Sequence, residues 1–141
     1  MSMFHYENTE LYYEMFEGQQ PVLLIHGWGI DHHYFTGCME PVFDQFPGQF
    51  RRFYIDLPGM GNSVPGNVQN SDDVLDVLCA FIQEKIYPNP FLIVGNSYGG
   101  MLARVITQRM PELVRAMILV CPAERFFLHE CESDQRSLAA F

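Results

Sequence analysis

The segment that most constrains the fold of this chain comprises residues 91–105, FLIVGNSYGGMLARV. It opens with a continuous apolar run, residues 91–94, which lies between Pro90 and Gly95 and is typical of a strand buried on both faces. From Met101 onward the apolar residues recur at helical spacing, which predicts a helix. Only a tight turn fits between these two elements.

That turn has the pattern G-x-S-x-G, with Ser97 at its centre. Gly95 and Gly99 permit a close backbone approach that side chains would prevent, and Ser97 is forced into a strained conformation. Its hydroxyl would then stand clear of the sheet at the start of a helix, where backbone N–H groups stabilise negative charge. Between a strand and a helix the pattern is typical of a nucleophile elbow, so Ser97 is a candidate for attack on a carbonyl carbon. A glycine-rich turn without catalytic meaning is the alternative.

The remainder of the chain alternates strands with helices after an N-terminal hairpin. We expect strands at 4–6, 11–16, 22–25, 51–57 and 116–121, and helices at 33–46 and from Asn70 or Ser71 to about 86. This alternation predicts an α/β fold with a mainly parallel sheet covered by helices on both faces. Ligands bind at the carboxyl ends of parallel strands, so the loops at 26–29, 56–63 and 95–99 should meet in one cleft.

Size and charge exclude several classes of protein. A chain of 141 residues that is 48% hydrophobic is one domain by length and can bury a core. The net charge of −9 argues against nucleic acid or anionic membrane surfaces as partners. The N-terminus lacks a signal-peptide pattern, and no uncharged apolar run could span a bilayer, so we expect a cytoplasmic protein.

Neither the cysteines nor the histidines predict a metal site or a cofactor. The four cysteines lie far apart and read as ordinary reduced thiols. His32 and His33 are adjacent, which on any regular element turns their side chains in different directions. A loop or surface position is therefore the expectation for both.

Three motifs together carry a resemblance to a known family. HGWG follows the third expected strand, DLPGMGNS the fourth and GNSYGG the fifth, and in this order they make the chain resemble the first part of an α/β-hydrolase. The resemblance implies that Ser97 is the nucleophile and that the backbone N–H groups of Trp28 and Tyr98 form the oxyanion hole. The side chains of Trp28 and Tyr98 would either line the acyl pocket or simply pack. The other site residues implied are the loop residues His26, Gly27 and Gly29, and the elbow residues Gly95, Asn96, Gly99 and Gly100.

The family's catalytic triad is incomplete in this chain. It runs Ser, then Asp or Glu, then His, and the family has eight strands where six are expected here. Downstream of Ser97 the only histidine is His129 and the only aspartate is Asp134, in reversed order on one short segment. Glu124 is a better candidate for the acid, with surface solvation as its alternative role. We therefore predict a single α/β-hydrolase core domain, residues 1–141, incomplete at its C-terminus after about the sixth strand.

The resemblance implies a serine hydrolase that acts on a carboxylic ester or related small acyl substrate through an acyl-enzyme, with little or no activity as this truncated chain. A C–C bond hydrolase and a catalytically silent fragment or binding module are the alternatives. A nucleotide-binding domain is weak, because Val64 stands where the dinucleotide fingerprint needs its third glycine. An apolar last strand left open at the sheet edge predicts a homodimer.

Overall fold

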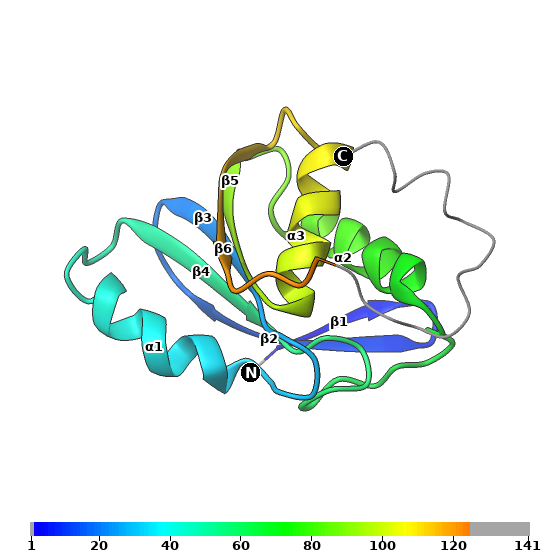
Figure 1. Cartoon of the computed structure of the whole chain (residues 1–141). Helices are drawn as coiled ribbons and strands as arrows, with labels where there is room; N and C mark the ends of the chain where they lie inside the picture. Colours follow the sequence, from blue (N-terminus) through cyan, green and yellow to red (C-terminus); the bar gives the residue numbers. More distant parts are fainter. Residues whose placement is uncertain (1, 125–141) are drawn as a thin grey trace.

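The computed structural model describes residues 2–124, and these form one six-stranded sheet with three helices (Figure 1). The elements are β1 (Ser2–Tyr6), β2 (Thr9–Phe16), β3 (Gln20–Ile25), α1 (His33–Phe43), β4 (Phe50–Ile55), α2 (Ser71–Lys85), β5 (Phe91–Asn96), α3 (Tyr98–Arg109) and β6 (Val114–Val120). The strand order is β1-β2-β4-β3-β5-β6. β2 pairs antiparallel with β1 and with β4, whereas β4, β3, β5 and β6 run parallel. The predicted hairpin and mainly parallel sheet are confirmed.

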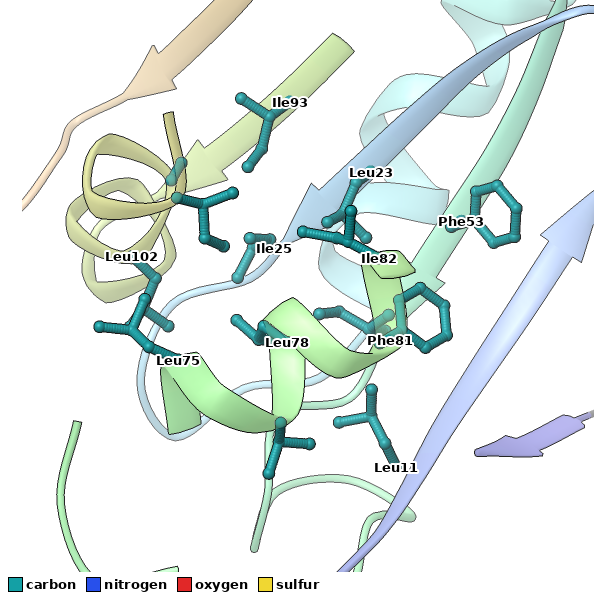
Figure 2. Close-up of a cluster of buried hydrophobic side chains, with 14 of the residues drawn as sticks. Leu11, Leu23, Ile25, Phe53, Leu75, Leu78, Phe81, Ile82, Ile93 and Leu102 are labelled. Carbon is teal, nitrogen blue, oxygen red and sulfur yellow. The ribbon is translucent and has the colours of Figure 1, made fainter. Parts of the chain in front are cut away.

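Helices cover both faces of this sheet, as the sequence predicts. α2 and α3 pack on one face, where the larger apolar cluster lies (Figure 2). α1 packs on the other face through Phe35 and Phe43, which contribute to a second apolar cluster. Along β3, Leu23 and Ile25 belong to the first cluster, while Val22 and Leu24 belong to the second. The continuous apolar run of β3 therefore serves two cores at once.

The helix ends follow the local chemistry of the chain. Asn70 caps α2 by accepting hydrogen bonds from the N–H groups of Asp72 and Asp73, and the Asp73 carboxylate accepts one from the Asn70 N–H. This capping box is the reason that α2 begins where the sequence predicts. α1 ends at Phe43, earlier than expected, and α3 begins at Tyr98 rather than Met101 because no connecting residues separate it from the turn at Ser97.

β6 differs from the other parallel strands in its exposure. It ends the strand order, and Ala116, Met117 and Ile118 are exposed, Ile118 to 53%. Within residues 2–124 no strand pairs with the outer edge of β6. None of the helices in this part of the chain has the length and apolar character needed to cross a membrane.

Candidate active site

Ser97 occupies the turn between β5 and α3 in a strained backbone conformation. Its φ is 49° and its ψ is −114°, a region that residues other than glycine rarely adopt. The Ser97 N–H donates to the Val120 carbonyl at 3.1 Å, and the Ser97 carbonyl accepts from the N–H of Ala123 at 3.0 Å. The residue is only half-buried, and its side chain does not cap α3. The turn therefore presents a serine hydroxyl at the N-terminus of a helix.

The glycines of this turn are required by backbone contacts. A Cβ on Gly95 would overlap the carbonyl of Gly99, and a Cβ on Gly99 would overlap the carbonyls of Ile25 and His26. On Gly100 it would lie 2.9 Å from the Cβ of Pro122. These contacts are the physical basis of the G-x-S-x-G-G pattern, because the first turn of α3 lies directly against β3 and β5.

The loop of residues 26–32 lies on this turn. A Cβ on Gly27 would be 2.7 Å from Asn96 Oδ1 and 3.2 Å from the Cβ of Ser97. The side chains of Trp28 and Tyr98 meet edge to face, with ring centroids 5.5 Å apart. The structure thus brings the predicted nucleophile and both predicted oxyanion residues together, as expected for loops at the carboxyl ends of β3 and β5. The direction of the two N–H groups toward a bound oxyanion stays a prediction.

The two aromatic side chains at this place have different surroundings. Tyr98 is 2% exposed and its hydroxyl donates to Ser71 Oγ at 2.9 Å, which joins the start of α3 to the start of α2. Burial raises the pKa of this phenol. Trp28, in contrast, is 58% exposed. Packing accounts for Tyr98, whereas Trp28 offers an exposed apolar surface next to the ring of Tyr98.

His26 is a buried structural residue of the loop. Its Nδ1–H donates to the Gly27 carbonyl at 2.7 Å, and its Nε2 accepts from the Leu57 N–H at 3.0 Å. This pair of bonds defines a neutral tautomer, and burial lowers the pKa of the imidazole. Both ring nitrogens of His26 are therefore engaged within the loop and with Leu57, and its role in shaping the oxyanion loop stays a prediction.

Asp56 is the centre of a buried polar network that sequence reasoning missed. It is fully buried at the end of β4, and its carboxylate accepts four hydrogen bonds, from the backbone and side-chain nitrogens of His32 and of Asn62. The Asp56 carbonyl accepts from Ser63 Oγ at 2.6 Å, and Ser63 Oγ accepts from the Tyr12 N–H at 2.8 Å. The signal was available in DLPGMGNS, where an acidic residue directly follows a buried strand, but its partner His32 lies 24 residues away.

His32 and His33 depart from expectation. His32 lies in the loop before α1, which is one of the two positions expected for it, but it is 2% exposed and lies between Asp56 and Glu14, so it is not at the surface. The two imidazole rings do not point in different directions but lie in contact, with centroids 4.0 Å apart and planes tilted by 35°, at the point where the chain enters α1.

Asp31, His32 and His33 place possible metal ligands within 4.8 Å of one another. Asp31 Oδ1, however, is hydrogen-bonded to His33 Nδ1 at 3.0 Å. His32 Nδ1 is likewise bonded to Asp56 Oδ1 at 2.8 Å. The arrangement therefore does not form a converging ligand set.

The described residues do not place a histidine base beside Ser97. His5 lies near Glu10 on the hairpin, His33 binds Asp31, and the two buried histidines have the partners given above. None of these contacts involves Ser97. Glu124 is exposed just beyond β6, at the end of the described chain. His129 and Asp134 lie outside the described residues.

A pocket of about 240 Å³ lies elsewhere in the molecule, between the hairpin turn and the start of α2. Its lining includes Thr9, Val68 and Asp73, and no residue of the turn around Ser97 contributes to it. Its position therefore gives no support to a ligand at the serine.

A strained serine between a parallel strand and a helix, with an HG loop against it, defines the class of α/β-hydrolases. Comparison with known proteins agrees, since residues 20–138 match the model of the alpha/beta hydrolase fold family. The chain belongs to this family.

Three similar proteins illustrate the relationship. The chain is 31% identical over 126 residues to a pimeloyl-[acyl-carrier protein] methyl ester esterase of Shewanella woodyi, a match covering 89% of this chain and 45% of the relative. Its identity to the protein of the same name in Chromobacterium violaceum is 34%, covering 80% and 41%. A crystal structure of an alpha/beta superfamily hydrolase from Oenococcus oeni superposes with a TM-score of 0.76 at 34% identity, covering 86% of this chain and 45% of that one. The chain thus spans less than half the length of these relatives.

Proposed function

We propose that this chain carries the nucleophile half of an esterase, in which Ser97 attacks the carbonyl carbon of a carboxylic ester and forms an acyl-enzyme. The observation that carries the proposal is the positive φ of Ser97 in a turn whose glycines leave no room for side chains. Such strain persists only where the surrounding structure enforces it, and it is common at catalytic residues. The names of the relatives, which act on a methyl ester, support an ester as the substrate class.

The chemistry assigned to the other residues follows from their positions. A tetrahedral oxyanion formed on Ser97 would lie between the N-terminus of α3 and the 26–32 loop, within reach of the N–H groups of Tyr98 and Trp28. Loss of one such donor in a serine hydrolase costs about 3 kcal/mol of transition-state stabilisation. Trp28, which is exposed and contacts Tyr98 next to the serine, would contact the acyl chain.

We further propose that this chain alone is impaired in turnover. A serine hydroxyl needs a general base to attack efficiently, and each histidine of residues 2–124 contacts another partner. Glu124 is retained as the candidate acid because it lies in the segment that follows β6. A catalytically silent module is the second candidate function, and the engagement of these histidines favours it.

Labelling with a fluorophosphonate probe tests the nucleophile. We expect the probe to modify the native chain slowly and not to modify Ser97→Ala, because oxyanion donors retain part of the reactivity of such a serine when no histidine base assists it. Ser71→Ala is the matched control, because Ser71 is also at a helix start and contacts Tyr98 but lies outside the turn. Absence of labelling in a well-folded native chain would favour the silent module.

Self-association is a separate proposal, with the outer edge of β6 as its site. In a twofold antiparallel pairing of two β6 strands centred on Met117, Arg115 of one copy would lie opposite Leu119 of the other, so no like charges would meet. The pairing would also bury the exposed Ile118. Sedimentation velocity over a concentration series should show a dimer, and Ile118→Lys should abolish it. Met3→Lys is the control at the opposite sheet edge, on β1, where the native side chain is 40% exposed. A monomer at all concentrations would reject the proposal.

A further inference from the structure

We infer that His32 and Asp56 are positioning residues, which fix the 26–32 loop beside Ser97 through a double attachment to the end of β4. The inference deepens the proposed function, because this loop carries the N–H group of Trp28. It concerns the way in which the oxyanion site is held in place, and it assigns a role to His32, for which the sequence indicates only a loop or surface position.

Both ends of the loop are attached to the same place in the chain. At its start, His26 Nε2 accepts from the Leu57 N–H at 3.0 Å. At its end, the N–H and the Nδ1 of His32 each lie 2.8 Å from Asp56 Oδ1. Asp56 and Leu57 are consecutive, so the two attachments share one anchor at the carboxyl end of β4.

The anchor itself is held rigidly. The second carboxylate oxygen of Asp56 accepts from the Asn62 backbone N–H at 2.8 Å and from Asn62 Nδ2 at 3.2 Å. The Asp56 N–H donates to the Tyr12 carbonyl at 2.9 Å, which joins the anchor to β2. A Cβ on Gly61 would overlap the carboxylate, so the surrounding loop closes tightly over it. The four bonds saturate the carboxylate and leave it one orientation.

Between its attachments the loop gains little from burial. Trp28 and Ile30 are exposed to 58% and 38%, and Gly29 has a φ of +75°. Apolar side chains that remain this exposed do not fix a backbone by packing. The hydrogen bonds at its two ends therefore add to the contacts of Gly27 with Asn96 and of Trp28 with Tyr98 in fixing the segment.

His33 provides a matched comparison for His32. It is the same residue type, one position later, and its ring contacts that of His32, but its side chain is 73% exposed and bonded only locally to Asp31. A general effect of losing a histidine in this segment should appear in both His32→Ala and His33→Ala. An effect of the attachment to Asp56 should appear only at position 32.

Trp28 is the only tryptophan of the chain, so its fluorescence reports directly on the loop. In His32→Ala we expect lower Trp28 anisotropy and a larger acrylamide quenching constant than in the native chain. His32→Asn should restore both, because its side-chain N–H can replace Nδ1–H as the donor to Asp56. His33→Ala should leave both unchanged.

The second readout is the rate of Ser97 phosphonylation in the same variants. A misplaced oxyanion donor should reduce the maximal rate constant of labelling by roughly ten- to a hundredfold with little change in the inhibitor concentration for half-maximal rate. His32→Asn should recover most of the loss. A general loss of folding would instead lower the labelled fraction and not this rate constant.

The outcomes separate the two proposals. If the native chain is not labelled but Trp28 responds as expected, the proposed nucleophile fails and the attachment of the loop is supported. If Trp28 behaves alike in native, His32→Ala and His33→Ala proteins, the inference is overturned whatever the labelling shows. If His32→Ala does not fold, Asn62→Ala replaces it in the test. Asn62 is exposed, and its loss removes one hydrogen bond to the Asp56 carboxylate. An unchanged Trp28 signal in that variant would then overturn the inference.

Discussion

The turn at Ser97 and the loop of residues 56–63 follow strands on either side of β3, yet they are held by different forces. The first is fixed sterically, since its glycines touch backbone that cannot move aside. The second is fixed by hydrogen bonds to the carboxylate of Asp56. A turn that is fixed sterically should therefore lose stability sharply when a single methyl group is added. A loop that is fixed by hydrogen bonds should lose stability in smaller steps, as individual bonds are removed.

The largest effect should come from Gly99→Ala. The added methyl group would overlap the carbonyls of Ile25 and His26, which belong to or follow a central strand, so relief requires β3 and α3 to separate. We expect a loss of roughly 3 kcal/mol or more in the free energy of unfolding, or no folded protein. Urea denaturation measures it.

Gly37→Ala is the matched control for that change. Gly37 lies inside α1, and a Cβ there would meet nothing within 4 Å. It should stabilise the protein by about 0.5–1 kcal/mol, because alanine is the better helix former. Equal effects of the two substitutions would show that the turn is not sterically fixed.

Asp56→Ala should have the second-largest effect. It leaves the buried donors of His32 and the backbone N–H of Asn62 without their acceptor, which should lower the free energy of unfolding by roughly 2–4 kcal/mol. The control is Asp31→Ala, because Asp31 accepts hydrogen bonds only from the exposed His33 and should cost about 1 kcal/mol or less. Similar losses in both variants, measured by chemical denaturation, would contradict a buried anchor at residue 56.

Ser97→Gly should shift stability in the opposite direction. The native φ of 49° is strained for serine and ordinary for glycine, so the substitution should raise the free energy of unfolding by about 1 kcal/mol. The comparison variant in the polar loop is Ser63→Ala. It should lower the free energy of unfolding by about 1 kcal/mol, because it removes the hydrogen bonds to Asp56 and Tyr12. A destabilised Ser97→Gly would mean that the turn stores no strain.

These two regions also differ in how much of their structure the sequence alone predicts. Residues 91–105 predict the strand, the turn and the helix because steric rules act between neighbours, and the expected position of Ser97 follows from the spacing of Gly95 and Gly99. The apolar runs of β3 and β5 likewise predict a sheet covered on both faces. For α1 and α3 the predicted bounds differ from the structure only at the helix ends.

The bond between His32 and Asp56 could not be predicted in the same way. It joins residues 24 positions apart, and no local pattern distinguishes a buried histidine from the exposed one beside it. Only the paths of β4 and the 26–32 loop through space bring the two together. The ring contact of His32 with His33 was likewise missed, because His32 is the residue before α1 and His33 is its first residue, so the two do not lie on one regular element.

The smallest predicted effect is a pH dependence confined to the polar region. Burial lowers the pKa of His26 in the folded state, so the unfolded chain binds a proton more readily near the ordinary histidine pKa of about 6.5. The free energy of unfolding should therefore fall as pH drops from about 7.5 to below about 6.5, since protonation would break the bond that Nε2 accepts from Leu57. His26→Asn should be less stable at pH 7.5 but should lose less on acidification, and denaturation midpoints at pH 7.5 and 5.5 measure both. Gly99→Ala changes no titratable group, so whatever fold it retains should keep the native pH slope. If the stability of His26→Asn changed with pH as much as that of the native chain, another group would control the loss of stability in acid. The difference between the steric and the polar region would then not include their pH dependence.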